Sequence, residues 1–210
     1  FRSPVLDLVN ADGSFGCDLR YQGYEICDGK YNLKGLPAVY AAEEEAQTLI
    51  IYMKDQVTGL QVELLYGVLP EYDVITRSAK VINTEEDKIR LTKAQAACID
   101  FLHGEFDVIS FYGRHAMERN MQRTSVGHGA FVIGSRRTSS HQYNPMLILA
   151  EKETTEDAGI CYGMSFVYSG GFKAEVEKDQ FGQTRMQMGL QEEQFSYPLK
   201  KGEEFVIPEV

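Results

Sequence analysis

Tryptophan is absent from the 210-residue sequence, and cysteine is scarce. The four cysteines, Cys17, Cys27, Cys98 and Cys161, form no CxxC pair, whereas a small secreted domain held by disulfides would contain a denser set. We therefore expect four free, mostly buried thiols in a reducing compartment, which predicts a cytoplasmic protein. The lack of tryptophan also counts against a free-standing sugar-binding module, because such modules stack aromatic rings on sugar faces.

Positive charge is also in short supply. The formal net charge is −10, and the densest basic spot is the pair Arg136 and Arg137. Acidic side chains repel phosphate groups, so the sequence predicts no binding to nucleic acid and none to an anionic membrane surface. No apolar run approaches the roughly 20 residues that a membrane-spanning helix requires.

Helical patterns are nearly missing as well. Residues 41–46 (AAEEEA) are good helix formers, but the segment is too short to hold alone, so we expect a charged loop or a single helical turn. No segment alternates strand and helix patterns, which argues against a parallel α/β sheet.

The sequence does contain a clear period of two. Residues 172–177 (FKAEVE) alternate apolar and charged side chains, and residues 60–68 carry a second apolar stripe whose opposite face is partly apolar. This alternation places one face of a strand on a core and the other face in water, with Glu175 and Glu177 expected on the solvated side.

Turn signals separate these strand patterns at short intervals. VTG at 57–59 predicts a hairpin between 48–55 and 60–69, and SGG at 169–171 predicts another between 161–168 and 172–178. NTEED at 83–87 is a further turn signal. Many short strands with frequent turns predict an all-β fold, a large antiparallel β-sandwich that spans residues 1–210 as a single domain.

A catalytic set is harder to find. Thirty-one Asp and Glu residues make a glycosidase-type carboxylate pair easy to propose and impossible to choose. The histidines His103, His115, His128 and His141 have no metal-binding spacing, and no GxSxG motif is present. We therefore predict no catalytic residue, no metal site and no cofactor in this chain.

Two polar segments interrupt the apolar strands. Residues 136–145 lie between two apolar runs, and residues 179–185 form a long connection between two expected strands. Such segments face a ligand or a neighbouring domain, or they are ordered by their own hydrogen bonds. The candidate residues for either role are Arg136, His141, Asn144, Asp179 and Gln180.

An ordered series of short motifs makes the interpretation more specific. The series is FRSP at 1–4, DLRY at 18–21, GLPAVY at 35–40, ITRS at 75–78, SRRTSSHQYNP at 135–145, TED at 155–157, VYSGGF at 167–172, DQFGQTR at 179–185 and IPEV at 207–210. Together these motifs resemble the N-terminal domain of glycoside hydrolase family 36 α-galactosidases, and the resemblance covers essentially the whole chain.

The resemblance implies a β-supersandwich of two large antiparallel sheets. It also implies that a catalytic (β/α)₈ barrel carrying the two catalytic aspartates follows in the longer protein and is absent here. The family reaction is the retaining hydrolysis of terminal α-D-galactosyl residues, as in melibiose and raffinose-type sugars. Family members are often homotetramers, so a homo-oligomer is implied.

These observations predict a non-catalytic scaffold and assembly domain whose partner is the C-terminal catalytic barrel of the same chain. It would meet the α-galactoside substrate only through the full enzyme. One alternative is a carbohydrate-binding module that holds galactosides itself, suggested by 12 Tyr, 11 Phe and the polar loop. Another is a related supersandwich enzyme such as a sugar mutarotase, which would need His and Glu to converge on one concave sheet face.

Overall fold

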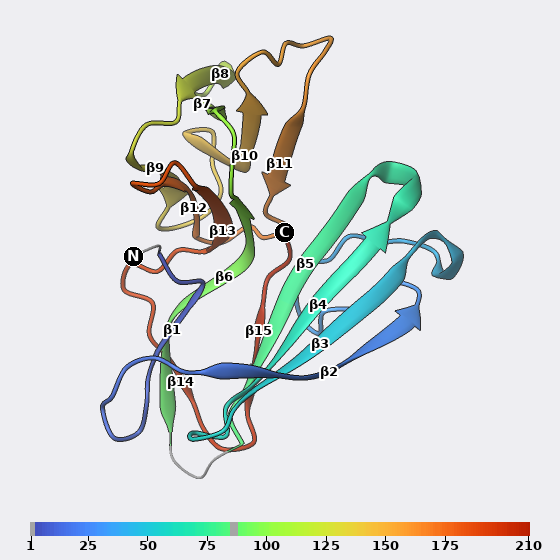
Figure 1. Ribbon diagram of the computed structural model, residues 1–210, viewed down its shortest axis with the longest axis vertical. Helices are drawn as coiled ribbons and strands as arrows, with labels where there is room; N and C mark the ends of the chain where they lie inside the picture. Colours follow the sequence, from blue (N-terminus) through green and yellow to red (C-terminus); the bar gives the residue numbers. More distant parts are fainter. Residues whose placement is uncertain (1–2, 85–87) are drawn as a thin grey trace.

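A computed structural model describes residues 3–84 and 88–210, so Phe1 and Arg2 of the first motif and residues 85–87 of the expected turn lie outside the described residues. The described strands form three antiparallel sheets (Figure 1). The six-stranded sheet contains β1 (Leu6–Val9), β6 (Ile89–Phe101), β9 (Gly129–Ser135), β12 (Phe172–Lys178), β13 (Thr184–Leu190) and β14 (Tyr197–Leu199). The four-stranded sheet contains β7 (Phe106–Arg114), β8 (Met117–Ser125), β10 (Tyr143–Glu151) and β11 (Cys161–Ser165). The five-stranded sheet contains β2 (Leu19–Asp28), β3 (Gln47–Asp55), β4 (Gln61–Leu69), β5 (Val74–Ile82) and β15 (Glu204–Ile207).

The helical content of the described residues is two short 3₁₀ turns, η1 (Glu43–Glu45) and η2 (Pro70–Tyr72). The first confirms the single helical turn expected at 41–46. Within the described ranges, no helix is long and apolar enough to cross a membrane. The all-β antiparallel fold predicted from the period of two is confirmed.

Alternation along β12 explains how the strands build the core. Phe172, Ala174 and Val176 point inward and are buried. Glu175, on the opposite face, was expected in solvent, but it is also buried. Lys173 holds it there, with 2.7 Å between Nζ and the Glu175 carboxylate. A neighbouring cation thus keeps a carboxylate stable on a face that the alternation alone predicts to be wet.

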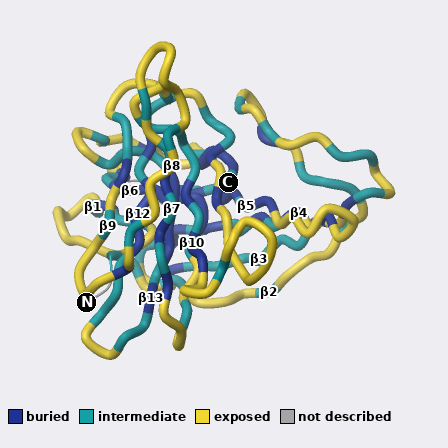
Figure 2. Tube along the Cα trace, turned by 90° about the horizontal axis from the view of Figure 1, so that it is seen from above, coloured by how far each residue is buried: buried dark blue, intermediate teal, exposed yellow. Residues whose placement is uncertain are grey.

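A single apolar core joins the three sheets. It includes Met186 and Met188 of the six-stranded sheet, Leu147 and Leu149 of the four-stranded sheet, and Val81 of the five-stranded sheet. Figure 2 shows that the buried residues gather along the central strands. The six-stranded sheet therefore forms one layer of the sandwich, and the other two sheets pack on its inner face.

The resemblance implied two large sheets, and the second of these is divided. Strand β11 is one edge of the four-stranded sheet, and the first half of β5 lies at the edge of the five-stranded sheet that faces it. Residues 207–210 run into the seam between them. Val210 and Arg77 exchange backbone hydrogen bonds of 2.8 and 2.9 Å, and Val167 N donates to Glu209 O at 2.8 Å. The last residues of the chain thus bridge the two halves of this layer.

A buried ion pair holds this bridge in place. Lys30 Nζ lies 2.6 Å from Glu209 Oε2, and the two side chains are 2% and 0% exposed. The other carboxylate oxygen accepts the Val39 backbone N–H at 2.9 Å. Lys30 Nζ also donates to Tyr31 O and lies 3.9 Å from the centroid of the Tyr31 ring. Both charges are therefore compensated, as buried charges must be.

The first expected hairpin is confirmed, since β3 pairs with β4. Its turn is held by Asp55, whose Oδ1 accepts the backbone N–H groups of Val57 and Thr58 at 2.8 and 3.1 Å. Gly59 follows with φ = 71°, a left-handed conformation that favours glycine.

The second expected hairpin is wrong. β11 pairs with β10 in the four-stranded sheet, whereas β12 pairs with β9 and β13 in the six-stranded sheet. Between them Phe166 enters the core and Val167 bonds to Glu209, so SGG at 169–171 ends a crossover between layers. Short-range turn chemistry cannot distinguish a hairpin from a crossover when the pairing partners lie elsewhere in the chain.

The cysteines form no disulfide in this structure, which describes all four of them. The expectation that they are mostly buried is wrong. Cys17, Cys27 and Cys98 are half-buried and Cys161 is exposed. Cys27 and Cys161 lie on the edge strands β2 and β11, where one side of the strand pairs with no other strand among the described residues.

The Lys30–Glu209 pair leads to a stability prediction. Lys30→Met should lower the free energy of unfolding by about 3–5 kcal/mol, because it leaves the Glu209 carboxylate buried without a cation. The matched double variant Lys30→Met/Glu209→Leu should recover most of this loss, since it removes both charges while keeping the volume. Urea unfolding of the three proteins measures the difference. Equal stability of Lys30→Met and the unsubstituted chain would contradict the assigned role.

Candidate functional site

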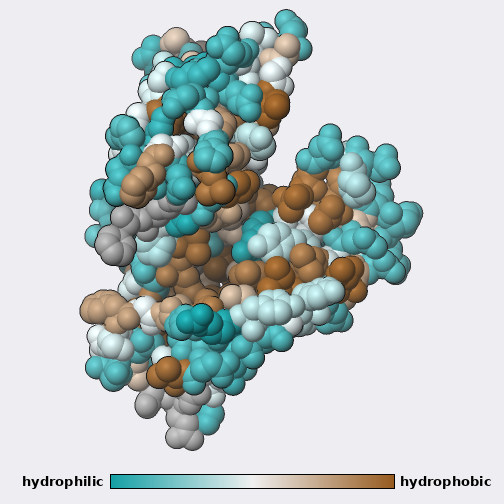
Figure 3. All heavy atoms as spheres, in the orientation of Figure 1, coloured by the Kyte–Doolittle hydropathy of each residue, from teal (hydrophilic) through white to brown (hydrophobic). Residues whose placement is uncertain are grey.

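An apolar cleft lies along the seam between the four-stranded and five-stranded sheets. It has a volume of about 520 Å³. Its walls come from β5 and from β11 with the residues that follow it, and its floor comes from β6. The lining includes Val39, Tyr66, Val74, Ile75, Thr76, Arg77, Ala97, Cys98, Ile99, Ser165, Val167 and Val210. Figure 3 shows this hollow between the two lobes, with hydrophobic residues gathered in it.

Arg77 is the cation that lines the cleft. Its guanidinium carbon lies 4.3 Å from the centroid of the Tyr66 ring, and burial lowers the pKa of this side chain. Arginine stays protonated at any physiological pH despite such a shift. The cleft thus combines a mostly apolar lining with one stacked cation, Arg77, and one carboxylate, Asp73.

One face of the five-stranded sheet continues this apolar surface. Residues paired across neighbouring strands lie on the same face, and the register Tyr24–Ile51, Ile51–Leu64, Tyr66–Arg77 and Val68–Ile75 traces it. We call this surface the open face. Its members are Tyr24, Ile26, Leu49, Ile51, Leu64, Tyr66, Val68 and Ile75.

The two faces of this sheet differ in what covers them. On the face opposite to the open face, Lys30 and Tyr31 approach Gly67, and Tyr31 N donates to Thr48 Oγ1 at 2.8 Å. The open face is packed where Val62, Ala79 and Val81 join the core, and Leu64 and Met53 pack against the core beside them. Toward its far end Tyr24, Ile26 and Ile75 are 63%, 61% and 64% exposed. Contiguous exposed apolar residues of this kind mark an interaction surface.

A second, polar depression lies at the four-stranded sheet, between β8 and the loop that leads into β10. It has a volume of about 720 Å³ and is lined by Glu118, Arg119, Ser139, Ser140, His141, Asn144 and Pro145. Two of the predicted residues, His141 and Asn144, are brought together here. Asn144 is half-buried, and its Nδ2 has no hydrogen-bond partner within the described part of the chain. Arg119 has φ = 56°, an uncommon value for a residue with a side chain.

The other three predicted residues lie elsewhere. Arg136 is exposed and forms an ion pair with Glu193. Asp179 and Gln180 lie in the turn between β12 and β13, at the opposite end of β12 from Arg136. The structure therefore divides the predicted set among three places and forms no single site from it.

Asp179 orders its own turn. Its Oδ1 accepts the backbone N–H groups of Phe181 and Gln183, each at 2.9 Å, and its carbonyl accepts the Gly182 N–H at 3.1 Å. His128 Nδ1 lies 2.8 Å from the same carbonyl oxygen. Gln180, in contrast, is exposed. The wide connection expected at 179–185 is thus a turn held by an aspartate side chain.

Carboxylates do not assemble into a hydrolytic pair in either hollow. Among the described residues, Glu118 is the one carboxylate that lines the polar depression, and Asp73 is the one that lines the cleft. A glycosidase needs two carboxyl groups about 5–10 Å apart across the scissile bond. Within residues 3–84 and 88–210, no group of three His, Cys, Asp or Glu side chains is placed to hold a metal ion.

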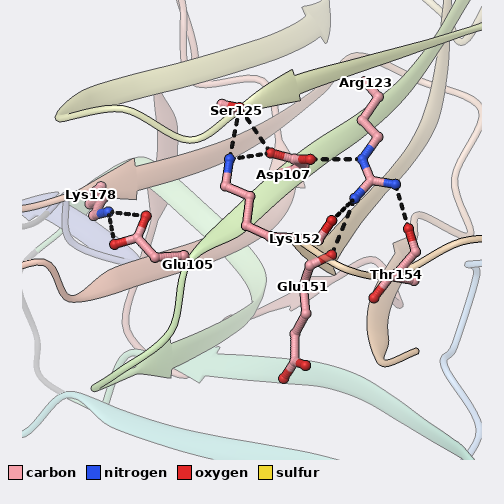
Figure 4. Close-up of polar contacts among 8 residues, drawn as sticks. All are labelled: Glu105, Asp107, Arg123, Ser125, Glu151, Lys152, Thr154 and Lys178. Atoms are coloured by element: carbon pink, nitrogen blue, oxygen red, sulfur yellow. Dashed lines mark hydrogen bonds and ion pairs between the residues drawn. The ribbon is translucent and has the colours of Figure 1, made fainter.

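A cluster of charged residues around Asp107 has a structural role (Figure 4). Asp107 of β7 accepts hydrogen bonds from Arg123 Nε at 2.8 Å, from Ser125 Oγ at 3.0 Å and from Lys152 Nζ. Arg123 also donates to the carbonyls of Glu151, Lys152 and Thr154. This network ties β7 and β8 to the turn after β10. Nothing in the sequence pattern pointed to it, because its members are far apart in the chain.

Comparison with known proteins decides the family. A model of the glycosyl hydrolase family 36 N-terminal domain matches residues 1–200. The chain belongs to this family.

Relatives of the chain include two bacterial α-galactosidases. The bifunctional alpha-galactosidase/sucrose kinase AgaSK of Mediterraneibacter gnavus is 60% identical over the whole chain, which covers 23% of that protein. Alpha-galactosidase Mel36A of Lactobacillus acidophilus is 42% identical over the whole chain, which covers 29% of it. The chain thus spans less than a third of the length of the curated relatives it matches.

Solved structures agree with this assignment. The galactosidase domain of AgaSK matches with a TM-score of 0.97 and 60% identity, and the GH36 α-galactosidase AgaA from Geobacillus stearothermophilus matches with a TM-score of 0.97 and 41% identity. In both cases all of this chain is covered, together with 29% of the other chain. The family 36 resemblance inferred from the motifs is therefore confirmed.

The Asp107 network of this family 36 domain predicts a pH dependence. Burial alone would raise the pKa of Asp107, but the hydrogen bonds from Lys152, Arg123 and Ser125 outweigh it and lower the pKa. A carboxyl group with a lowered pKa stabilises the folded state above its unfolded pKa of about 4, and this contribution is lost as the pH falls through the folded value. The stabilisation should therefore be complete at pH 7.

Asp107→Asn should lower the free energy of unfolding by about 1–3 kcal/mol at pH 7. The difference in the free energy of unfolding between this variant and the unsubstituted chain should become smaller as the pH falls below about 4, because the Asp107 carboxyl group of the unsubstituted chain then becomes protonated. Urea unfolding of both proteins at a series of pH values measures this difference. A gap that stays constant from pH 7 to pH 2.5 would contradict the assigned charge network.

The turn of residues 179–183 supplies another prediction. Asp179→Ala should cost about 1 kcal/mol of stability, because two backbone N–H groups lose their acceptor. Gln180→Ala is the matched control, since this neighbouring side chain is exposed, and it should change stability by less than about 0.5 kcal/mol. Thermal unfolding of the two variants and of the unsubstituted chain measures both changes in stability. Two equal shifts would show that the Asp179 carboxylate does not hold the turn.

Proposed function

We propose that this chain is a non-catalytic scaffold and assembly domain of an α-galactosidase. The longer protein hydrolyses terminal α-D-galactosyl residues, as in melibiose and raffinose-type oligosaccharides, with retention of configuration. Its catalytic (β/α)₈ barrel follows in the same chain and carries the two catalytic aspartates. This portion supplies structure, and the substrate is met by the full enzyme.

One observation carries the proposal: the cleft and the adjoining open face together form an apolar surface. The cleft and the open face expose aliphatic and aromatic side chains next to each other. Sugars are recognised by hydroxyl-binding groups together with aromatic platforms, whereas a protein partner buries apolar area. The open face therefore suits a protein surface better than a sugar.

The relatives support the same proposal. The chain matches the model of the family's N-terminal domain, and its relatives AgaSK and Mel36A are named α-galactosidases. Variants of AgaA have been solved in complex with stachyose and with raffinose. We extend this substrate class to the longer protein to which the present chain would belong.

Assembly and location form the remaining parts of the proposal. A homo-oligomer, as in tetrameric family members, would bring further surfaces into contact, and Arg136, His141, Asn144, Asp179 and Gln180 then face the barrel or order their own loops. Strand β2 is an edge of the five-stranded sheet whose outer side pairs with no described strand, so it is available for such contacts. A cytoplasmic location fits the four cysteines, none of which is in a disulfide.

The isolated 210-residue chain should not hydrolyse p-nitrophenyl α-galactoside. Calorimetric titration with galactose, melibiose and raffinose should give no heat of binding, because the described residues place no carboxylate pair in the cleft or in the polar depression. Turnover that survives repurification would contradict the scaffold role. Sub-millimolar binding of any of the three sugars would favour the carbohydrate-binding alternative.

A further inference from the structure

We propose that residues 3–5 form a releasable strap on the outer face of the six-stranded sheet, fastened at Ser3 by Lys93, Glu177 and Arg185. Release of the strap admits water to the side chain of Gln187 while the sheet stays folded. This inference is independent of the proposed function, since it concerns contacts within this domain alone.

Every polar group of Ser3 is bound by a charged side chain, and the three side chains come from three strands. The Ser3 N–H donates to Glu177 Oε2 of β12 at 3.0 Å, and the Ser3 carbonyl accepts from Arg185 Nη1 of β13 at 3.0 Å. Lys93 Nζ of β6 donates to the Ser3 hydroxyl at 2.6 Å. Hydrogen bonds that involve an ionised group are stronger than those between neutral groups. Ser3 is therefore the point at which the strap is fastened.

The two cations that hold Ser3 keep other partners when the strap leaves. Arg185 donates to both carboxylate oxygens of Asp100, from Nε at 2.7 Å and from Nη2 at 2.8 Å. Lys93 Nζ lies 3.2 Å from Glu192 Oε2. An isolated buried charge would strongly disfavour the open state, and these ion pairs prevent it. The sheet is thus able to release Ser3 without losing the charge balance of its own side chains.

The strap crosses a buried polar row of the sheet. Arg185, which bonds to Ser3, and Gln187 lie two residues apart on β13 and so share its outer face. The position two residues beyond Gln187 pairs with Gln95 of β6, and the Gln95 N–H donates to Val5 O at 2.8 Å. Residues 3–5 therefore pass over the row that contains Gln187.

Gln187 opposes closure of the strap. It is 2% exposed, and neither its Nε2 nor its Oε1 has a hydrogen-bond partner in the described part of the chain. The Oε1 atom of Gln95, which lies in the next row, also has none there. A buried polar group without a partner disfavours the state that buries it, by an amount similar to what a charge-assisted bond contributes. The bonds at Ser3 and the unpartnered amide atoms beneath the strap thus act in opposite directions.

The sequence concentrates the attachment on one residue. Pro4 has no N–H to donate, and it restricts the preceding Ser3 to extended backbone. Val5 is 38% exposed, so it adds little buried apolar area. Ser3 and Pro4 belong to the first sequence motif, to which the proposed function assigns no role. Loss of the Ser3 contacts is therefore sufficient to open the strap.

Amide hydrogen exchange in the full-length protein, resolved by residue, tests the strap. Glu177→Gln should speed exchange of the Ser3 and Gln95 amides about tenfold, because a neutral acceptor replaces the carboxylate that binds Ser3. Glu105→Gln is the matched control, since Glu105 pairs with Lys178, the residue next to Glu177. The control should change these two rates by less than about twofold. Equal effects of the two substitutions would overturn the proposal.

Amides within the sheet distinguish local release from unfolding. Val176 and Met188 are buried on the central strands β12 and β13, so their exchange should be the same in Glu177→Gln and in the unsubstituted protein. If their exchange accelerates as much as that of Ser3, the sheet itself opens, and the proposal of a separate strap is wrong.

A second substitution should act in the opposite direction. Gln187→Met keeps the approximate volume and removes the two unpartnered polar atoms, so it should stabilise the closed strap. Exchange of the Ser3 and Gln95 amides should then become about fivefold slower. Unchanged or faster exchange in this variant would show that Gln187 does not oppose closure and would overturn the proposal.

Discussion

The buried Lys30–Glu209 ion pair is the interaction on which the arrangement of this domain depends. Its two residues lie near opposite ends of the sequence, and both side chains are almost completely buried. Around them, residues 207–210 bridge the two halves of the divided layer through Arg77 and Val167. The pair therefore fixes residues 207–210 in the seam and, with them, the position of the five-stranded sheet relative to the rest. A buried ion pair is weak evidence for high stability, but it specifies one register of the parts that it joins.

From this constraint the form of the molecule follows. The six-stranded sheet makes one continuous layer, and the opposite layer is split, which leaves an apolar cleft and an open sheet face beside residue 210. The charged clusters, in contrast, are satisfied internally, as Asp107 and Asp179 show. The polar groups of the domain hold its own loops and sheets, and its apolar surface is the part available to a partner.

The sequence predicted the strands well because period-two alternation is local. The 48–69 hairpin, the short helical turn near 43–45 and the turn at 179–183 all depend on neighbouring residues, and all are found. The 161–178 hairpin was wrong because the pairing of β11 with β10 and of β12 with β9 is decided by packing between layers. The burial of Glu175 was also missed. Its charge is compensated by Lys173, which also pairs with Glu192 from a later segment of the chain, and that arrangement is not visible in the local alternation.

The candidate residues illustrate the same limit. Polar density in the loops identified His141 and Asn144, which do line one depression, but Arg136, Asp179 and Gln180 lie elsewhere. The open face was not recognised, because its members come from four strands whose register is not visible in sequence. The one available signal was the run 60–68, whose second face is partly apolar, as expected for a strand between two layers.

Fragment complementation tests the central claim most directly, namely that this domain contributes a surface and not the chemistry. The remainder of the longer protein, expressed without these residues, is assayed for α-galactoside hydrolysis before and after addition of the 210-residue chain. The account predicts weak or no activity for the remainder alone. Addition of the chain should restore activity in a saturable manner. Full activity and stability of the remainder on its own would contradict the account.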